Sequence, residues 1–296
     1  MAIIPAMTTR SPIPRRLAVC SHPGIPDSGA LAQEIASRLK RAGAEAIAGT
    51  LVDPPVREAV LGGKVDMLIA LGGDGTMLRA GHLCSQHGVP VLGINLGHLG
   101  FLIEVERGGW AHALERVLSG EYWLESRMML RVSWLREDRL QGEWEVLNEC
   151  AVGRGRSVRL VELVTEIDGT YLTTYAADAL ILATATGSTA YALAAGGPIL
   201  PPELRNILIV PVAPHFSVDR AVVLHEGSTV SVTVRTAHEA TLSMDGQPPI
   251  DLKDGDRVRV CAAEHAVEFV RLQDPGYFYR DLQSRMRRAT SRGAAA

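Results

Sequence analysis

The glycine-rich run Gly72-Gly73-Asp74-Gly75-Thr76 constrains this chain more than any other feature of its sequence. It follows an apolar segment, residues 65–71, that is typical of a buried strand, and it precedes a segment, residues 76–87, with apolar side chains at helical spacing. A strand, a glycine-rich turn and a helix in this order form the ligand-binding corner of an open parallel sheet. The run therefore predicts an α/β fold with a binding site at the end of the 65–71 strand.

The residue types in this turn indicate phosphate chemistry. The glycines let the backbone adopt positive φ and approach a ligand closely, and the start of the following helix attracts anions. A loop that only held phosphates would not carry a carboxylate at its centre, so Asp74 needs a task of its own. It either accepts a proton from a hydroxyl that attacks phosphorus, or it holds a magnesium ion that bridges phosphates. Both tasks predict phosphoryl transfer, whereas an ordinary turn with an Asp N-cap is the alternative without a reaction.

Other nucleotide motifs are missing from the sequence. The chain contains no G-x-x-x-x-G-K-[ST], no G-x-G-x-x-G and no H-R-D signature. P-loop ATPases, ordinary dehydrogenases and protein kinases therefore lose their main support.

Composition limits the remaining classes. With 296 residues, 47% of them hydrophobic and 21% charged, the chain is long enough for two globular domains. The formal net charge of −3 provides no overall positive field, so we expect neither a nucleic-acid nor a membrane partner. The four cysteines form no C-x-x-C pair, and no apolar stretch approaches the roughly 20 residues that span a bilayer. We therefore expect a soluble, cytoplasmic protein with reduced thiols in or near its core.

The pattern of elements changes along the chain. Strand and helix patterns alternate between Leu17 and about Glu121, which is typical of a parallel sheet covered by helices. Beyond about Tyr122, short segments alternate polar and apolar residues and have Asp-Gly pairs at their turns, which predicts antiparallel β structure. The last stretch, residues 281–296, is rich in arginine, and we expect a solvated, fraying tail. The predicted strands span 17–20, 65–71, 90–95, 129–134, 144–147, 229–234 and 257–260, and the predicted helices span 29–42, 76–87 and 110–118.

Two segments of the second half carry further polar groups. Asn148 and Glu149 end a strand-like run; an amide can pair with a base edge and a carboxylate can accept from a ribose diol, although turn chemistry explains the pair equally well. Between 175 and 198 an apolar strand leads into a hydroxyl-rich turn, with Tyr191 as a flat face. A capped small helix that starts near Ala190 is the alternative. Serine-nucleophile chemistry has little support because no G-x-S-x-G elbow is present. The hydroxyl residues of the turn are Thr184, Thr186, Ser188 and Thr189.

Taken together, these motifs resemble the NAD kinase family, and in particular its bacterial members. The 72–76 run, Asn148-Glu149 and the segment Thr186–Tyr191 with Gly196-Gly197-Pro198 occur in the family's order and spacing. Further matches are found at 97–101, Pro214-His215, Arg220 and 245–247, so the resemblance extends from about Val65 to about Gln247. The 72–76 run alone is shared with lipid kinases and resembles phosphofructokinase.

The resemblance implies phosphorylation of the adenosine-ribose 2′-hydroxyl of NAD to give NADP, with ATP, another nucleoside triphosphate or polyphosphate as donor and a divalent ion such as Mg²⁺. Asp74 would be the proton acceptor, followed in the dinucleotide site by Gly75 and Arg79, and Asn148 and Glu149 would hold the adenosine part. The other positions expected to line or approach the ligand are Arg159, Ala176, Asp178, Thr189, Ala190, Tyr191, Ala194 and Gln247.

The resemblance also implies an architecture. We expect a flexible tail at 1–16, a Rossmann-like or phosphofructokinase-like parallel α/β domain at 17–125, an antiparallel β-sandwich-like, NAD-binding domain at 126–271, and a segment at 272–296 that returns to the first domain. A homo-oligomer, dimer or tetramer, is expected to complete the active sites. Two rivals remain: a lipid kinase, which would need an amphipathic basic element that the chain lacks, and a silent NAD(P)-binding regulator, against which the intact Asp74 and Asn148-Glu149 argue.

Overall fold

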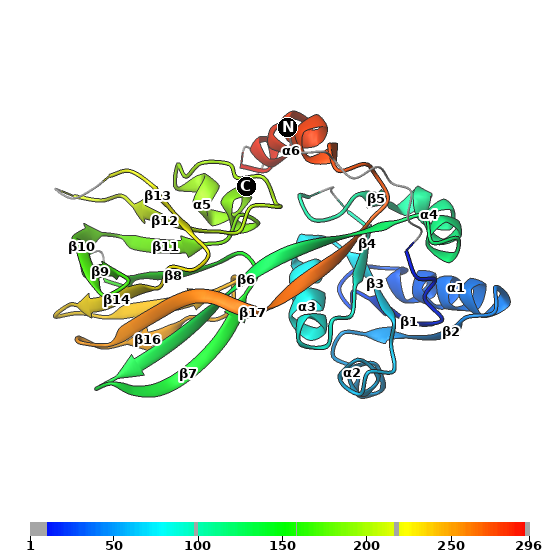
Figure 1. Cartoon of the computed structure of the whole chain (residues 1–296), viewed down its shortest axis with the longest axis horizontal. Helices are drawn as coiled ribbons and strands as arrows, with labels where there is room; N and C mark the ends of the chain where they lie inside the picture. The colour runs from blue at the N-terminus through cyan, green and yellow to red at the C-terminus, as the bar shows by residue number, and fades with distance from the viewer. Residues whose placement is uncertain (1–10, 98–99, 158, 216–218, 294–296) are drawn as a thin grey trace. The chain divides into compact units, whose positions relative to one another are not determined.

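The computed structural model describes residues 11–97, 100–157, 159–215 and 219–293. The chain divides into two compact units: a first unit, Met1–Ser126 with Val267–Ala296, and a second unit, Arg127–Ala266. The chain leaves the first unit within strand β6 (Trp123–Arg136) and re-enters it within strand β17 (Arg257–Arg271) (Figure 1). The first unit is therefore built from two separate stretches of chain.

A parallel sheet forms the centre of the first unit. Its strands lie in the order β2, β1, β3, β4, and β5 and the end of β17 also pair with β4. The side chains of Ile35 and Val117, from the two helices α1 and α4, pack with Ile69 of β3 in one apolar core. The strands are β1 (Arg16–Ser21), β2 (Glu45–Thr50), β3 (Met67–Gly72), β4 (Val91–Asn95) and β5 (Val105–Glu106). The helices are α1 (Ser28–Arg41), α2 (Pro54–Leu61), α3 (Asp74–Cys84), α4 (Trp110–Leu118) and α6 (Tyr277–Gly293), with single 3-10 turns at Ser85–His87 and Arg107–Gly109.

The second unit consists of antiparallel strands on both sides of one apolar core. One sheet has the order β13, β12, β11, β8, β15, β16, and the other contains β10, β9, β14 and β17, with β6 pairing to β17 and β7. Leu182 and Val152 from the first sheet share the core with Leu163 and Val232 from the second. The remaining elements are β7 (Arg139–Val146), β8 (Glu149–Arg154), β9 (Val161–Ile167), β10 (Thr170–Ala177), β11 (Ala179–Ala183), β12 (Asn206–Val212), β13 (Val222–His225), β14 (Val230–Arg235), β15 (Ala240–Met244), β16 (Ile250–Leu252), a 3-10 turn (Gly187–Thr189) and α5 (Tyr191–Ala194).

The predicted fold class is confirmed: a parallel α/β part is followed by an antiparallel, sandwich-like part. The cysteines are free, and Cys20, Cys84 and Cys150 are buried, as predicted. Of the three predicted Asp-Gly turns, those at Asp168 and Asp245 have positive φ at both residues, as a type I′ turn requires, whereas Asp254 before Gly255 does not adopt positive φ. Among the described residues, no helix has both the length and the apolar character needed to cross a bilayer.

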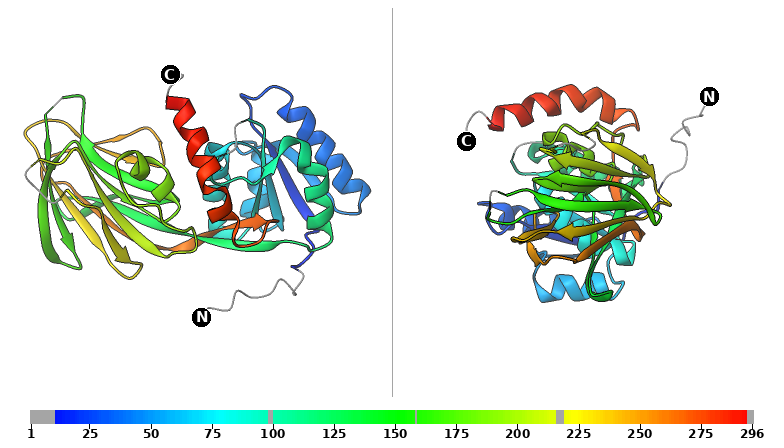
Figure 2. Two further views of the ribbon diagram at one scale, coloured as in Figure 1. Left: turned by 90° about the horizontal axis from the view of Figure 1, so that it is seen from above. Right: turned by 90° about the vertical axis from the view of Figure 1, so that its left-hand side faces the viewer.

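The prediction of a fraying tail at 281–296 is wrong as far as Gly293, and at Arg285 the prediction of a solvated side chain is wrong as well. Helix α6, red in Figure 2, continues to Gly293, and the side chain of Arg285 is only 4% exposed. Residues 294–296 lie outside the described part of the chain, as do residues 1–10 of the predicted N-terminal tail. Ser11, which follows them, donates its amide to the carbonyl of Gly120 at 3.0 Å.

Candidate functional site

The glycine-rich run connects β3 to α3 in the first unit. Gly72 ends β3, Gly73 is the N-cap of α3, and Asp74 occupies the first turn of the helix. A Cβ on Gly72 would lie 2.2 Å from Oγ1 of Thr76, so the packing of this turn requires a glycine there. A Cβ on Gly73 or Gly75 would meet open space, which leaves the backbone accessible to a ligand.

The expected reason for these glycines needs a correction. Gly72, Gly73 and Gly75 do not adopt positive φ, and Gly73 has φ −117°. The turn requires glycines because they lack a side chain, not because they adopt a left-handed backbone conformation. At Gly72 the absence of Cβ permits close packing against Thr76, and at Gly73 and Gly75 it permits a ligand to approach the backbone closely.

The carboxylate of Asp74 is fixed by the backbone of a distant segment. The amide of Phe101 donates to Oδ2 at 2.7 Å, and the amide of Leu102 donates to Oδ1 at 3.2 Å. A Cβ on Gly100 would fall 2.1–2.3 Å from the carboxylate atoms, so only glycine fits beside them. Because each carboxylate oxygen can accept more than one hydrogen bond, Asp74 retains capacity for a substrate hydroxyl.

Two predicted neighbours of Asp74 lie on the same helix. Thr76 is buried and donates its amide to the carbonyl of Gly73 at 2.8 Å, which tightens the first turn. Arg79 is exposed one turn further along α3. Of the predicted match at 97–101, residues 98 and 99 lie outside the described part of the chain.

In the second unit, Leu147 and Asn148 connect β7 to β8, Glu149 begins β8, and Asp245 holds this turn in place. The carboxylate of Asp245 accepts the amides of Leu147, Asn148 and Glu149 at 2.7, 2.9 and 3.0 Å. The sequence placed Asp245 in an Asp-Gly turn and in the family match at 245–247, but it indicated no contact for the side chain. Nothing in the sequence indicates that this side chain contacts the turn at 147–149, which lies about a hundred residues earlier in the chain.

The predicted hydroxyl-rich turn packs against the same backbone. Thr184 donates its hydroxyl to the carbonyl of Leu147 at 2.6 Å and its amide to the carbonyl of Asn148 at 2.9 Å. A Cβ on Gly187 would lie 2.2 Å from the carbonyl oxygen of Asn148. The turn after β11 and the turn before β8 are therefore one tightly packed unit. Buried Arg127, which sequence reasoning missed, donates to the hydroxyl of Thr186 at 3.0 Å.

Glu149 has an unusual carboxyl group. Burial and the nearby charge of Asp245 raise its pKa to about 7, although a hydrogen bond from the backbone amide of Tyr191 opposes this shift. Its Oε2 atom is buried and has no hydrogen-bond partner among the described residues. A ligand hydroxyl would satisfy this oxygen, because an ionised carboxylate accepts and does not donate.

The other predicted residues are less closely connected. Asp178 pairs with Arg154 at 2.7 Å, and the carbonyl of Ala176 accepts the amide of His215 at 2.8 Å. Thr189 and Ala190 donate within their own 3-10 turn, to the carbonyls of Thr186 and Gly187. Three further predicted residues are exposed: Arg159, Ala194 and Gln247.

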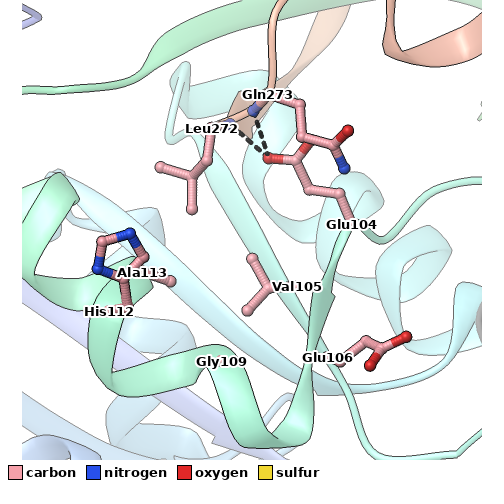
Figure 3. A pocket seen from close by; sticks show the side chains of 8 residues that line it. All are labelled: Glu104, Val105, Glu106, Gly109, His112, Ala113, Leu272 and Gln273. Atoms are coloured by element: carbon pink, nitrogen blue, oxygen red, sulfur yellow. Dashed lines mark hydrogen bonds between the residues drawn. The ribbon is translucent and has the colours of Figure 1, made fainter. Parts of the chain in front are cut away.

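A hollow of about 180 Å³ lies elsewhere in the first unit and contains none of the predicted site residues (Figure 3). The carboxylate of Glu104 in its wall accepts the amides of Leu272 and Gln273, and burial raises the pKa of Glu104. The contacts of Glu104 bind the chain after β17 to the chain before β5. This hollow is therefore a structural feature of the first unit and not the candidate site.

Fold and site together define a two-domain protein that presents a carboxylate at the N-terminus of a helix in a glycine-rich loop. Comparison with known families agrees: residues 30–122 match the ATP-NAD kinase N-terminal domain, and residues 147–272 match the ATP-NAD kinase C-terminal domain. The chain belongs to the NAD kinase family, a family of phosphotransferases, which confirms the resemblance inferred from the motifs.

Individual relatives cover most of the chain. An NAD kinase from Chloroflexus aurantiacus is 40% identical over 93% of this chain and 99% of its own length, and one from Symbiobacterium thermophilum is 42% identical over 84% and 90%. Among solved structures, yeast NADH kinase complexed with NADH superimposes with a TM-score of 0.80 at 26% identity, covering 91% of this chain and 86% of that one. An NAD kinase from Archaeoglobus fulgidus in complex with ATP has a TM-score of 0.73 at 27% identity, covering 92% and 98%.

Proposed function

We propose that this chain transfers the terminal phosphoryl group of ATP to the 2′-hydroxyl of the adenosine ribose of NAD, giving NADP. The proposal depends on one observation: the carboxylate of Asp74, at the start of α3, is oriented by the backbone amides of Phe101 and Leu102. The chain that carries it is a member of the NAD kinase family. Two solved structures of similar fold, yeast NADH kinase complexed with NADH and the Archaeoglobus fulgidus NAD kinase in complex with ATP, support the same pair of substrates.

Asp74 acts as the proton acceptor in this proposal. A ribose hydroxyl is a poor nucleophile at neutral pH, and a positioned carboxylate that takes its proton contributes about 10²–10⁴-fold to the rate. Phosphoryl transfer leaves little covalent chemistry for the protein, so alignment and charge neutralisation supply the rest. The accessible backbone at Gly73 and Gly75 suits contact with the donor phosphates.

The turn at Asn148 and Glu149 binds the adenosine part of NAD. The buried Oε2 of Glu149 accepts a ribose hydroxyl, and the Asn148 side chain, which both donates and accepts, pairs with the base edge. Arg159, Ala176, Asp178, Thr189, Ala190, Tyr191, Ala194 and Gln247 remain predictions for the rest of the dinucleotide.

The residues of the chain fit a magnesium ion that arrives with the donor. No three His, Cys, Asp or Glu side chains come together as an ion cage among the described residues. Mg²⁺ commonly keeps several waters and is held largely by substrate phosphates, so such a cage is not required. When bound, the ion neutralises charge on the transferred group. Polyphosphate as an alternative donor, a dimer or tetramer, and a cytoplasmic location remain predictions from the family resemblance.

Replacing Asp74 tests the proposal directly. We expect Asp74→Asn to bind NAD with nearly unchanged affinity while its kcat for NADP formation falls by about 10²–10⁴-fold. The assay uses the full chain with NAD, magnesium and ATP, and measures NADP specifically; a parallel reaction with polyphosphate compares the donors.

A matched substitution controls for loss of a negative charge. Glu34→Gln changes a carboxylate to an amide on the exposed face of α1, and we expect wild-type kcat from it. Full turnover by Asp74→Asn would remove this residue from the mechanism. If the wild-type chain formed no NADP with either donor, the proposed reaction itself would be wrong.

A further inference from the structure

A buried arginine from the C-terminal helix holds the segment that orients Asp74. Arg285 of α6 is 4% exposed, and its Nη1 donates to the carbonyl of Gly100 at 2.5 Å and to that of Ile103 at 3.4 Å. Its Nη2 pairs with Asp281 at 3.3 Å, and its guanidinium lies 5.9 Å from the ring centroid of Tyr277. All of these residues belong to the first unit.

The same segment contacts Asp74 through its amides. The carbonyl of Gly100 and the amide of Phe101 belong to one planar peptide unit, in which the C=O and N–H bonds point in opposite directions. Arg285 holds the oxygen of this peptide, and the Oδ2 atom of Asp74 accepts its N–H at 2.7 Å. Rotation of this single peptide plane would therefore break both contacts together.

The bond from Arg285 also affects the strength of the bond to Asp74. Hydrogen bonds with an ionised donor are shorter and stronger than neutral ones, and they polarise the peptide that they contact. Such polarisation makes the Phe101 N–H a better donor. Burial of a guanidinium costs stability unless its donors are paired. Nη1 of Arg285 donates to the two carbonyls of the segment and Nη2 to Asp281, whereas the buried Nε has no partner among the described residues. The contact with the segment therefore depends on Nη1.

We propose that Arg285 is a positioning residue: it fixes the Gly100–Phe101 peptide so that the amide of Phe101 orients the Asp74 carboxylate for proton transfer. The inference rests on the proposed role of Asp74 as the proton acceptor. Through Arg285, helix α6 would contribute to the reaction without contacting substrate, although it begins at Tyr277, far along the chain from the Gly100–Phe101 peptide.

Steady-state kinetics of substituted full-length chains test the proposal. Misplacement of a catalytic group by about 1 Å can cost about 10²-fold in rate, so we expect Arg285→Gln to lower kcat by about 10- to 100-fold and to change KM for NAD less than about threefold. Arg285→Lys keeps the positive charge but replaces the planar guanidinium and its several fixed donors by a single ammonium group. We therefore expect it to lower kcat less, by about three- to tenfold. Arg280→Gln is the matched control, because Arg280 is an exposed arginine of the same helix that pairs with Asp274, and it should keep wild-type kcat.

Two further measurements separate positioning from general stabilisation. Because Arg285 acts through Asp74, we expect Arg285→Gln to lower kcat no further in the Asp74→Asn background, a non-additivity that defines coupled residues. Hydrogen exchange followed by mass spectrometry should show faster exchange in the peptide that contains Phe101 and Leu102 for Arg285→Gln, with the rest of the first unit unchanged, and no such change for Arg280→Gln.

The outcomes that overturn the inference are specific. A folded Arg285→Gln with kcat within twofold of wild type, or with unchanged exchange at Phe101 and Leu102, would refute it. If Arg285→Gln does not unfold cooperatively, Arg285→Lys decides: wild-type kcat together with wild-type exchange in that peptide would refute the proposal. Loss of activity in Asp74→Asn with full activity in Arg285→Gln overturns only this inference, whereas full activity in Asp74→Asn overturns the proposed function.

Discussion

Glu149 is a carboxyl group whose charge near neutral pH is set by its surroundings. Burial and the neighbouring Asp245 raise its pKa from the ordinary 4.5 to about 7. The folded chain therefore binds this proton more tightly than the unfolded chain does. Protonation of Glu149 stabilises the fold at low pH, and this contribution is lost as the pH rises from about 4.5 through 7.

Glu149→Gln removes this proton-linked contribution. We expect the free energy of unfolding of the wild type, minus that of Glu149→Gln, to fall between pH 5 and pH 8 by up to roughly 3 kcal/mol, since one pKa unit corresponds to about 1.4 kcal/mol. Urea denaturation of both chains at several pH values measures the difference. A difference that stays constant or rises with pH would contradict the assignment of the shift to Glu149.

Asp245 acts on the same turn through three backbone amides. Asparagine tolerates the positive φ at this position but replaces one acceptor oxygen by a donor, so Asp245→Asn should release part of the Asn148-Glu149 turn. We expect KM for NAD to rise about tenfold, the effect of losing about 1.4 kcal/mol of binding. The control is Asp168→Asn, in a turn of the same Asp-Gly type that caps the amide of Thr229. Equal KM values for the two variants would argue against a role for Asp245.

At the scale of elements, local patterns were sufficient where a segment is fixed by its own periodicity. The 17–20, 65–71 and 90–95 patterns predicted β1, β3 and β4 within two residues at each end, and 110–118 predicted α4 in full. Such strands and helices are determined by apolar spacing, which the sequence displays directly. The glycine-rich loop was predictable for the same reason, because strand, turn and helix are consecutive.

The residues alone did not predict which distant segments meet, and only the family resemblance implied that 272–296 returns to the first domain. The stretch 281–296 has the composition of a solvated tail, yet Arg285 is buried because the carbonyls of Gly100 and Ile103 accept its donors. Asp245 likewise meets the amides of 147–149 only through the pairing of β15 with β8. A single sequence shows which residue is charged, but not which backbone groups the fold will bring to it.

A buried ionic cluster connects β6, β17 and α6 in the first unit. Arg271 pairs with Glu125 at 2.7 Å, and the hydroxyl of Tyr277 donates to Glu125 at 2.9 Å. Loss of that hydroxyl leaves a buried carboxylate less satisfied, so we expect Tyr277→Phe to lower the free energy of unfolding by about 1–3 kcal/mol. Tyr279→Phe, at a 60% exposed tyrosine two residues later, should change it by less than about 0.5 kcal/mol. Denaturant melts that do not separate the two variants would contradict this role.

In the molecule as a whole, the two units differ in continuity, because one is a single stretch of chain and the other is assembled from two. The second unit is one continuous stretch, Arg127–Ala266, with an apolar core of its own. The first unit needs residues from both ends: Phe269 of β17 pairs with Val91 of β4, and Arg271 pairs with Glu125. Insertion of one domain into another in this manner is tolerated when the inserted part closes its own core.

Two fragments test whether each unit can fold from one continuous stretch of chain. We expect residues 127–266, expressed alone, to unfold in one cooperative transition, because the core of the second unit lies within the fragment. We expect residues 1–126 alone to lack such a transition, since Val270 and Leu272 of the first unit's core and the arginine partner of buried Glu125 are missing, and an unpaired buried charge costs about 3–5 kcal/mol. Adding residues 267–296 through a short linker should restore cooperative unfolding, as measured by circular dichroism in urea. Cooperative unfolding of 1–126 without that segment would mean that β17 and α6 are not required for the first unit to fold.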